Sequence, residues 1–316
     1  MSGVPFISWL GHGAADLAPP GLFKGANANM LAFEADITAM QALADKLINP
    51  AGGGEVVYKV LLSTAMVSFI DIARCSSAVD VVGWLPGREC AFWVPLLESH
   101  PNDPTLDRFV FWAPYIFINY TIGLVVGRQT WGWPKVLADI TVASDNPAAP
   151  VFDCATTYFP TLSQTTQGVT GSLFKITGLS ADTQPQAVWR AGEQAFAALA
   201  EALLEGVAKA LVDDLGDLPQ VPSVALKQFR QPGAEEIACY QAICDSPIEI
   251  IAFRDGGLLP DGLTLEITTC QSHPIVADFL GQAPNPGFTS VPVLFGAWSN
   301  VDFLALSGSD IVVTTA

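Results

Sequence analysis

Short apolar runs rich in β-branched and aromatic residues recur along most of the chain, and Gly, Pro, Asn or Asp interrupt them. This pattern is typical of β-strands joined by turns. In the first part of the chain it predicts strands at residues 55–73, 89–97, 109–126, 137–143 and 169–177. We expect residues 109–126 to form two buried strands with a bend near Asn119, because the run is rich in Phe, Tyr, Ile and Val.

Two segments favour helices instead of strands. Residues 37–47 predict a short helix, and residues 185–215 predict a long one. Asp182 or Thr183 can cap the start of the long helix, and Gly216 suits its end. Its apolar residues follow one another at spacings of three and four, namely Phe196, Leu199, Leu203, Val207 and Leu211. Such a stripe indicates a helix packed on the sheet, and the alternative is a helix that binds a partner.

Strand-like runs return after the long helix, at residues 225–229, 235–244, 248–253 and 264–269. Turns are expected at residues 255–257 and 259–262, a loop at 282–287, and a loosely held tail beyond it. Many strands with few helices predict a β-rich α+β fold rather than alternating β-α-β units. With 316 residues, the chain is expected to form one domain over residues 1–316.

The composition describes an apolar and acidic chain. Half of its residues are hydrophobic, only 14% are charged, and the mean hydropathy is +0.39. The run at 109–126 is long enough to span a bilayer, but Pro114, Asn119 and Thr121 interrupt it, so we expect a soluble protein. Residues 1–20 hold no Lys or Arg, which argues against a secretory signal and favours a cytoplasmic location. The formal net charge of −17 opposes binding to nucleic acid or to an anionic membrane surface.

The cysteines and histidines form no recognisable metal motif. Six cysteines are scattered without a CxxC pair, namely Cys75, Cys90, Cys154, Cys239, Cys244 and Cys270. A chain of this size does not need disulfides, so free thiols are expected. His12, His100 and His273 lack an HExxH spacing. Because no nucleotide or flavin motif is found either, we expect neither a metal ion nor a dissociable cofactor.

Lys135 stands out among the seven lysines because of its apolar surroundings. It follows Trp131, Trp133 and Pro134 and precedes Val136, between two strand-like runs. Burial disfavours the charged form of an amine. A neutral amine attacks ketones and aldehydes and forms an imine, which withdraws electrons from the adjacent carbons. From the residues alone, the alternative is a lysine paired with an acidic neighbour.

The segment around this lysine resembles a known motif. Residues 127–138, GRQTWGWPKVLA, are similar to the GRExxGxPKKLA segment of the acetoacetate decarboxylase family. The resemblance implies that Lys135, the first lysine after the proline, forms a Schiff base with the keto carbon of the substrate. Residues 88–96, RECAFWVPL, resemble the family's strand that carries an active-site glutamate, which implies this position for Glu89.

Weaker similarities extend the resemblance over residues 25–270. Residues 115–119 are similar to the strand with the family's Y-x-D-N turn, residues 31–36 to its first strand and helix, and residues 222–227 to a late strand. The resemblance implies an antiparallel sheet curled into a barrel or cone, with flanking helices and the long helix near 185–215 as an enlargement. It also implies a small keto substrate and a homo-oligomer.

The sequence departs from the family pattern at three positions. Val136 stands where the decarboxylases carry a second lysine, so repulsion between adjacent ammonium groups is replaced here by desolvation as the means to activate Lys135. Gln129 replaces a glutamate. No arginine precedes Arg74, so Lys24 is the nearest substitute for the family's carboxylate-binding arginine.

Several residues near the motif are candidates for the site. Glu89 can shuttle protons at the α-carbon of an imine, and its alternative role is an ion pair with Arg88 or Arg128. We also consider Arg128, Trp131, Trp133 and Phe92 as residues that bind the substrate, with structural roles as the alternative.

These observations lead to two hypotheses of different classes. In the first, the chain is a Schiff-base lyase that uses Lys135, either to decarboxylate a β-keto acid or to catalyse aldol or dehydration chemistry on a keto compound. In the second, the fold holds a small apolar ligand and Lys135 is unreactive.

Overall fold

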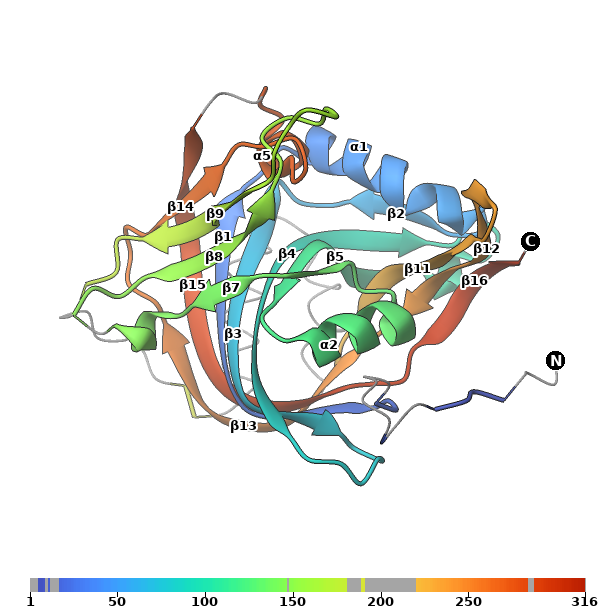
Figure 1. Ribbon diagram of the computed structural model, residues 1–316, viewed down its shortest axis with the longest axis horizontal. Coiled ribbons are helices and arrows are strands. Elements are labelled where there is room, and N and C mark those ends of the chain that lie inside the picture. Colours follow the sequence, from blue (N-terminus) through green and yellow to red (C-terminus); the bar gives the residue numbers. More distant parts are fainter. Residues whose placement is uncertain are drawn as a thin grey trace.

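The computed structural model describes residues 5–8, 11, 17–146, 148–180, 189–190, 220–283 and 287–315. Apart from residues 189 and 190, the long helix predicted at 185–215 lies outside the described residues. The described part is rich in strands and has few helices, as predicted (Figure 1). None of its helices is both long enough and apolar enough to cross a membrane.

The α-helices of the described part are α1 (Ile37–Leu47), α2 (Thr121–Val126) and α5 (Ile275–Leu280). The strands are β1 (Gly21–Glu34), β2 (Val57–Val60), β3 (Thr64–Ser77), β4 (Leu85–Ser99), β5 (Arg108–Ile118), β6 (Lys135–Leu137), β7 (Asp139–Thr141), β8 (Phe152–Tyr158), β9 (Val169–Thr177), β10 (Gln220–Val221), β11 (Ser223–Gln231), β12 (Ala234–Asp245), β13 (Ile248–Leu258), β14 (Thr264–Thr268), β15 (Phe288–Ala305) and β16 (Ser309–Thr315).

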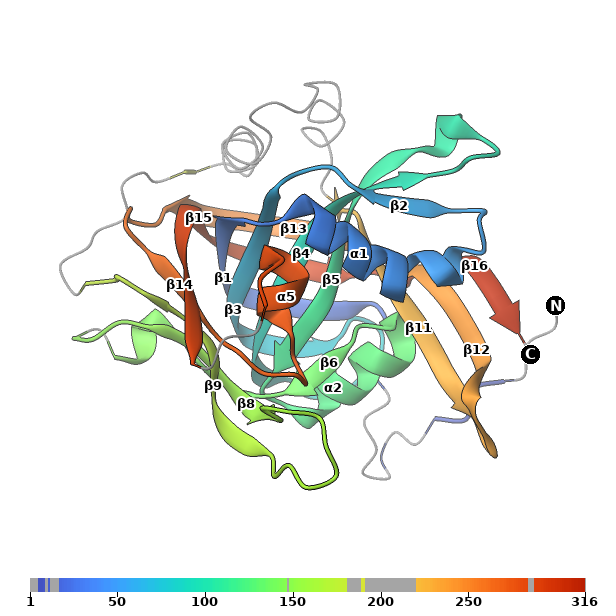
Figure 2. The same cartoon turned by 90° about the horizontal axis from the view of Figure 1, so that it is seen from above.

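These strands form one mostly antiparallel, strongly curled sheet (Figures 1 and 2). Its main path runs β16-β12-β11-β5-β4-β3-β1-β15-β14-β9-β8-β7. β6 pairs with β5, and the β5–β6 and β5–β11 pairs are parallel. The terminal strands β16 and β7 do not pair with each other in the described part, so the expected closure into a barrel is not confirmed.

The main core fills the inside of the curl, where side chains alternate along the strands. On β4, Cys90 and Phe92 point into this core, and both are fully buried. Ala91 belongs instead to a second apolar cluster with Ile116 and Trp131. Because successive side chains of a strand point to opposite faces, β4 contributes to both clusters.

The helix α1 agrees with the predicted bounds, and its sequence explains both its start and its packing. Asp36 caps it by accepting hydrogen bonds from the backbone N–H groups of Thr38 at 2.7 Å and Ala39 at 3.0 Å. Met40 and Leu43 are buried on one face. α1 lies beside α5 at one end of the curled sheet (Figures 1 and 2).

The prediction of two strands at 109–126 is wrong in its second half. β5 ends at Ile118, and Asn119 closes the strand with two hydrogen bonds to the backbone of Arg88. The chain then turns into α2, where backbone groups find partners within the segment, as in the bond from Leu124 N–H to the Tyr120 carbonyl. A π-helical turn, Gly127–Trp131, follows directly.

Two further expectations fail near the end of the chain. Residues 255–257 do not form a turn but continue β13, where Gly256 pairs with Ser299 across the sheet. The tail is not loosely held, because β15 lies in the centre of the sheet between β1 and the strands β13 and β14. The turn predicted at 259–262 is present, with Gly262 at φ 79°.

Candidate active site

The backbone around Lys135 is fixed by β-pairing and by two glycines. β6 runs parallel to β5, with Lys135 opposite Ile116, and Ile116 is opposite Ala91 on β4. Glu89 lies two residues from Ala91 and therefore on the same face. The pairing thus brings β4 and β6 side chains to one spot, although 46 residues separate Glu89 from Lys135 in the sequence.

The Lys135 amine is buried and makes an ion pair. The residue is 3% exposed, and its Nζ donates a hydrogen bond to Oε2 of Glu89 at 2.5 Å. The amine also lies over the ring of Trp133, 4.7 Å from the ring centroid. The carboxylate and the face of the ring both attract the positive end of the lysine side chain. Moving one proton to Glu89 would leave both partners neutral.

Glycines let the lysine lie close to the backbone. A Cβ atom at Gly127 would come within 2.7 Å of Cδ and 2.8 Å of Cε of Lys135. Gly132 ends the π-helical turn at φ 77°, and a Cβ there would come within 2.6 Å of Lys227. Glycine adopts this left-handed conformation without steric cost. Gly127 therefore leaves room for the Lys135 side chain, and Gly132 leaves room for Lys227.

A cavity of about 40 Å³ opens beside the Lys135 side chain. Most of its walls are apolar, and they include Phe23, Trp131 and Trp133. Its polar walls include Cys75 and Tyr120. Burial of charged and polar side chains beside such a cavity strengthens the electrostatic interactions between them, because less water screens them.

Cys75 and Tyr120 form a hydrogen-bonded pair that sequence reasoning missed. Burial raises the pKa of the Cys75 thiol to about 11, and it raises the pKa of the Tyr120 hydroxyl as well. The Tyr120 ring occupies the space that Cβ atoms at Gly87 and Gly123 would need. These two glycines are the only local sequence signal for the position of this ring, and no signal marks Cys75.

The other predicted site residues lie in different places. Trp131 and Trp133 line the cavity and stack on each other with ring centroids 4.9 Å apart. Phe92 lies in the main core, on the opposite face of β4 from Glu89, so it does not line the cavity. Arg128 is exposed and does not line the cavity, and its Nη1 donates to the Lys135 carbonyl at 3.1 Å. The proposed ion pairs of Glu89 with Arg88 or Arg128 are not formed, because Lys135 takes the carboxylate.

The structure also locates the residues at which the sequence departs from the family. The side chain of Val136 packs against the main core, away from Lys135. Lys24 is exposed on β1, opposite Arg74 of β3. Gln129 is exposed as well. Within the described part of the chain, Lys135 is therefore the one cation that lines the cavity.

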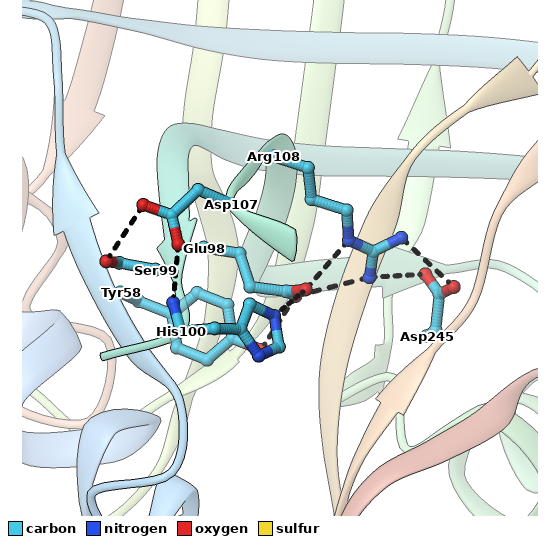
Figure 3. Close-up of polar contacts among 7 residues, drawn as sticks. All are labelled: Tyr58, Glu98, Ser99, His100, Asp107, Arg108 and Asp245. Carbon is cyan, nitrogen blue, oxygen red and sulfur yellow. Dashed lines mark hydrogen bonds and ion pairs between the residues drawn. The ribbon is translucent and has the colours of Figure 1, made fainter. Parts of the chain in front are cut away.

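The largest buried charged cluster lies at another part of the sheet (Figure 3). Glu98 is 2% exposed and accepts hydrogen bonds from Tyr58 at 3.0 Å and from Arg108 at 2.7 Å. His100 lies 3.1 Å from the same carboxylate, and Arg108 also reaches Asp245 of β12. Its groups bond to one another and join β2, β4, β5 and β12, although Oδ1 of Asp245 makes only an ion pair with Arg108 and no hydrogen bond. The described residues contain no group of three or more His, Cys, Asp or Glu side chains that could hold a metal ion.

No family model matches the sequence, and no curated protein matches it either. Solved structures do resemble the fold. Acetoacetate decarboxylase from Legionella pneumophila has a TM-score of 0.60 at 15% identity, with 100% of this chain and 94% of that chain covered. An acetoacetate decarboxylase-like enzyme from Sphingomonas wittichii RW1 has a TM-score of 0.57 at 14% identity, with 98% and 100% covered.

A third similar structure is the enduracididine biosynthesis enzyme MppR, complexed with the condensation product of pyruvate and imidazole 4-carboxaldehyde. Its TM-score is 0.55 at 15% identity, and 98% of each chain is covered. These likenesses confirm the resemblance stated from the motif: the chain has the acetoacetate decarboxylase-like fold. They also extend it beyond residues 25–270, because the likeness to the Legionella enzyme covers the whole chain.

Proposed function

We propose that this protein is a Schiff-base enzyme whose Lys135 condenses with the carbonyl group of a keto compound. One observation carries the proposal: a lysine that is 3% exposed donates to the carboxylate of Glu89 at 2.5 Å beside an apolar cavity. Burial of such a pair is costly unless something compensates it, and a buried ion pair beside an apolar cavity is a candidate for a functional site. The acetoacetate decarboxylase-like fold supports the proposal.

The reaction begins with proton transfer from the Lys135 ammonium group to Oε2 of Glu89. The neutral amine adds to the carbonyl carbon, and the electrons of the C=O π bond move to oxygen, which takes the proton back from Glu89. The resulting carbinolamine loses its hydroxyl group and one proton as water, which leaves the imine. Glu89 is again a carboxylate and lies within reach of a proton on the carbon next to the imine.

The cavity walls favour an uncharged substrate over a β-keto acid. Lys135 is the one cation on the walls within the described residues, and Glu89 already holds it. A substrate carboxylate in this cavity would find no free counter-ion, because Glu89 already pairs with the lysine, and an uncompensated charge is costly at low dielectric. We therefore favour aldol or dehydration chemistry on a neutral ketone or aldehyde over decarboxylation. In each of these reactions the imine stabilises a carbanion at the adjacent carbon.

Borohydride trapping tests the proposal. The protein is incubated with small ketones and aldehydes, reduced, digested and examined by mass spectrometry. We expect a stable adduct on the peptide that contains Lys135 and its loss in Lys135→Ala. Lys59→Ala is the control, because Lys59 is an exposed lysine on β2 and its loss should leave the adduct unchanged. If no carbonyl compound labels Lys135, the enzyme proposal fails and a ligand-binding protein with an unreactive lysine is the remaining hypothesis.

A further inference from the structure

We propose that a second pocket, on the outer side of the Trp133 loop, binds an apolar monocarboxylate with Arg128 as its carboxylate anchor. This pocket has a volume of about 480 Å³, within the range of about 300–1,000 Å³ that is usual for small-molecule sites. It is separate from the cavity that holds the Lys135 amine, although Trp133 contributes to both. The proposal goes beyond the Schiff-base function and does not depend on it.

Residues from four parts of the chain build the walls. Trp112 comes from β5, Leu124 from α2, Trp133 from the motif loop, and Leu226 and Phe229 from β11. Trp112 and Trp133 are at most 9% exposed, so their rings form a fixed floor, whereas Phe229 is 41% exposed at the rim. Such a pocket, mostly apolar with a few polar groups, removes the hydrocarbon part of a ligand from water.

Arg128 supplies the charged group of this pocket. Its Nη1 donates to the Lys135 carbonyl at 3.1 Å, which fixes the direction of the guanidinium group. A guanidinium group has five N–H donors, and this bond uses one of them. The remaining donors suit a carboxylate, which arginine binds in a bidentate manner.

The partners of other arginines make Arg128 unusual. Arg88, Arg108 and Arg254 each hold at least one carboxylate, and Arg74 lies over the Trp84 ring at 4.8 Å. The chain has 31 acidic residues for 14 basic ones, so acidic partners are abundant. Arg128 nevertheless faces an apolar pocket and donates to a backbone carbonyl. An anionic ligand with an apolar body complements this arrangement in both charge and polarity.

The neighbouring polar groups leave the anchor position to Arg128. Gln228 also lines the pocket, but its side-chain oxygen already accepts a hydrogen bond from Gln241 at 2.9 Å. Gln129 is exposed and carries no charge. The pocket therefore distinguishes a carboxylate from a neutral head group through Arg128 alone, so a single substitution at this residue should remove the preference.

Isothermal titration calorimetry with octanoate, octan-1-ol and octylamine tests the proposal on the full chain. We expect saturable binding of octanoate, with the alcohol and the amine at least tenfold weaker. Arg128→Gln should weaken octanoate at least tenfold and leave octan-1-ol unchanged, and Arg128→Lys should weaken it less because the charge is kept. Lys59→Gln is the control for loss of one positive charge at a distant exposed position.

Three titration results would overturn the proposal. These are no binding of octanoate to the wild-type chain, equal affinity for octanoate and octan-1-ol, and unchanged octanoate affinity in both Arg128 variants. Circular dichroism establishes that each variant is folded before titration. Light scattering on the same samples measures whether a second copy of the chain covers the pocket. If self-association blocks the binding of octanoate, the pocket is a subunit interface and the monocarboxylate proposal is wrong.

Discussion

At the scale of single residues, the site depends on how closely Lys135 lies to its own loop. The lysine passes over Gly127, and its amine ends between Glu89 and the Trp133 ring. The sequence motif identified this lysine, but the hydrogen bond to Glu89 depends on β4, β5 and β6 lying side by side. The chemistry therefore belongs to a pair of residues whose distance is set by the sheet.

Gly127→Ala should displace the amine without removing it. The new Cβ would lie 2.7 Å from Cδ of Lys135, and the flexible lysine side chain has to move to relieve this contact. We expect the rate of imine trapping on Lys135 to fall at least tenfold, because small misplacements are costly for reactivity. Gly83→Ala, at an exposed loop position where a new Cβ meets no atom within 4 Å, is the control for a glycine substitution. Equal trapping rates in wild type and Gly127→Ala would show that the close contact is irrelevant.

Glu89→Gln should keep the shape of the site but remove its base. A positioned general base contributes about 10²–10⁴-fold to a proton transfer, so we expect imine formation to slow by about 100-fold. The measurement is the rate of adduct formation at saturating carbonyl compound, followed by mass spectrometry. An unchanged rate in Glu89→Gln would assign Glu89 to the structural role of an ion-pair partner.

At the scale of elements, strands that are bounded by clear turn residues could be predicted from the sequence. Strands whose conformation depends on pairing with distant strands could not. The helix at 37–47 has a cap and one apolar face, so its bounds follow from local chemistry. The run at 109–126 is mostly apolar and has no clear period, so its pattern does not separate β5, which pairs with β4 as far as Ile118, from the following α2. No strand was predicted at β15, because its extended conformation depends on pairing with β1 and β13, which lie far from it in the sequence.

The Glu98 cluster is expected to hold several strands together. Arg108→Ala removes the main cation from a carboxylate that is 2% exposed. Loss of one partner of a fully buried pair costs about 3–5 kcal/mol, and we expect about 2–3 kcal/mol here because Arg108 is 36% exposed. Chemical denaturation measures the change in the free energy of unfolding. Lys175→Ala breaks a more exposed pair with Glu266 and should cost less than about 1 kcal/mol. Equal losses for the two variants would contradict a stabilising role for the cluster.

The segment before α5 makes stability depend on pH. Burial lowers the pKa of His273, whose ring lies 5.7 Å from that of Phe117. In the unfolded chain the imidazole takes up a proton near pH 6.5, while the folded chain resists this. The contribution of His273 to the free energy of unfolding is therefore complete above about pH 6.5. It is lost as the pH falls towards the pKa of the folded state, by at most about 1.4 kcal/mol per pH unit.

Neighbouring Asp278 acts in the opposite direction. Its hydroxyl partner is Tyr115, and burial raises the pKa of the Asp278 carboxyl group. The contribution of Asp278 to the free energy of unfolding is present at low pH and is lost as the pH rises through the pKa of the folded state. Denaturation curves of wild type and His273→Gln between pH 7.5 and 5 separate the two groups. We expect the wild type to lose more stability than His273→Gln over this range; parallel curves would show that His273 does not titrate differently on folding.

At the scale of the whole molecule, scarce positive charge shapes both pockets. Fourteen cationic residues serve a chain with a net charge of −17. One of them, Lys135, lines the first cavity and pairs with Glu89, and another, Arg128, lines the larger pocket. Glu89, which already pairs with Lys135, disfavours a second carboxylate next to this lysine. The expected homo-oligomer stays a prediction, consistent with the unpaired edges of β16 and β7 in the described part.

The most direct test of the central claim compares pentane-2,4-dione with acetoacetate, a neutral diketone with a keto acid of nearly the same size. Each compound is added to the wild-type chain and to Lys135→Ala, and the adduct is measured by intact mass over time. The acetoacetate imine is trapped with borohydride, whereas the diketone adduct is a conjugated enaminone and is measured without reduction. We expect one adduct per chain from the diketone, formed at least tenfold faster than that from acetoacetate and absent in Lys135→Ala. Labelling that survives Lys135→Ala would contradict the assignment of the nucleophile, and faster labelling by acetoacetate would contradict a site for uncharged carbonyl compounds.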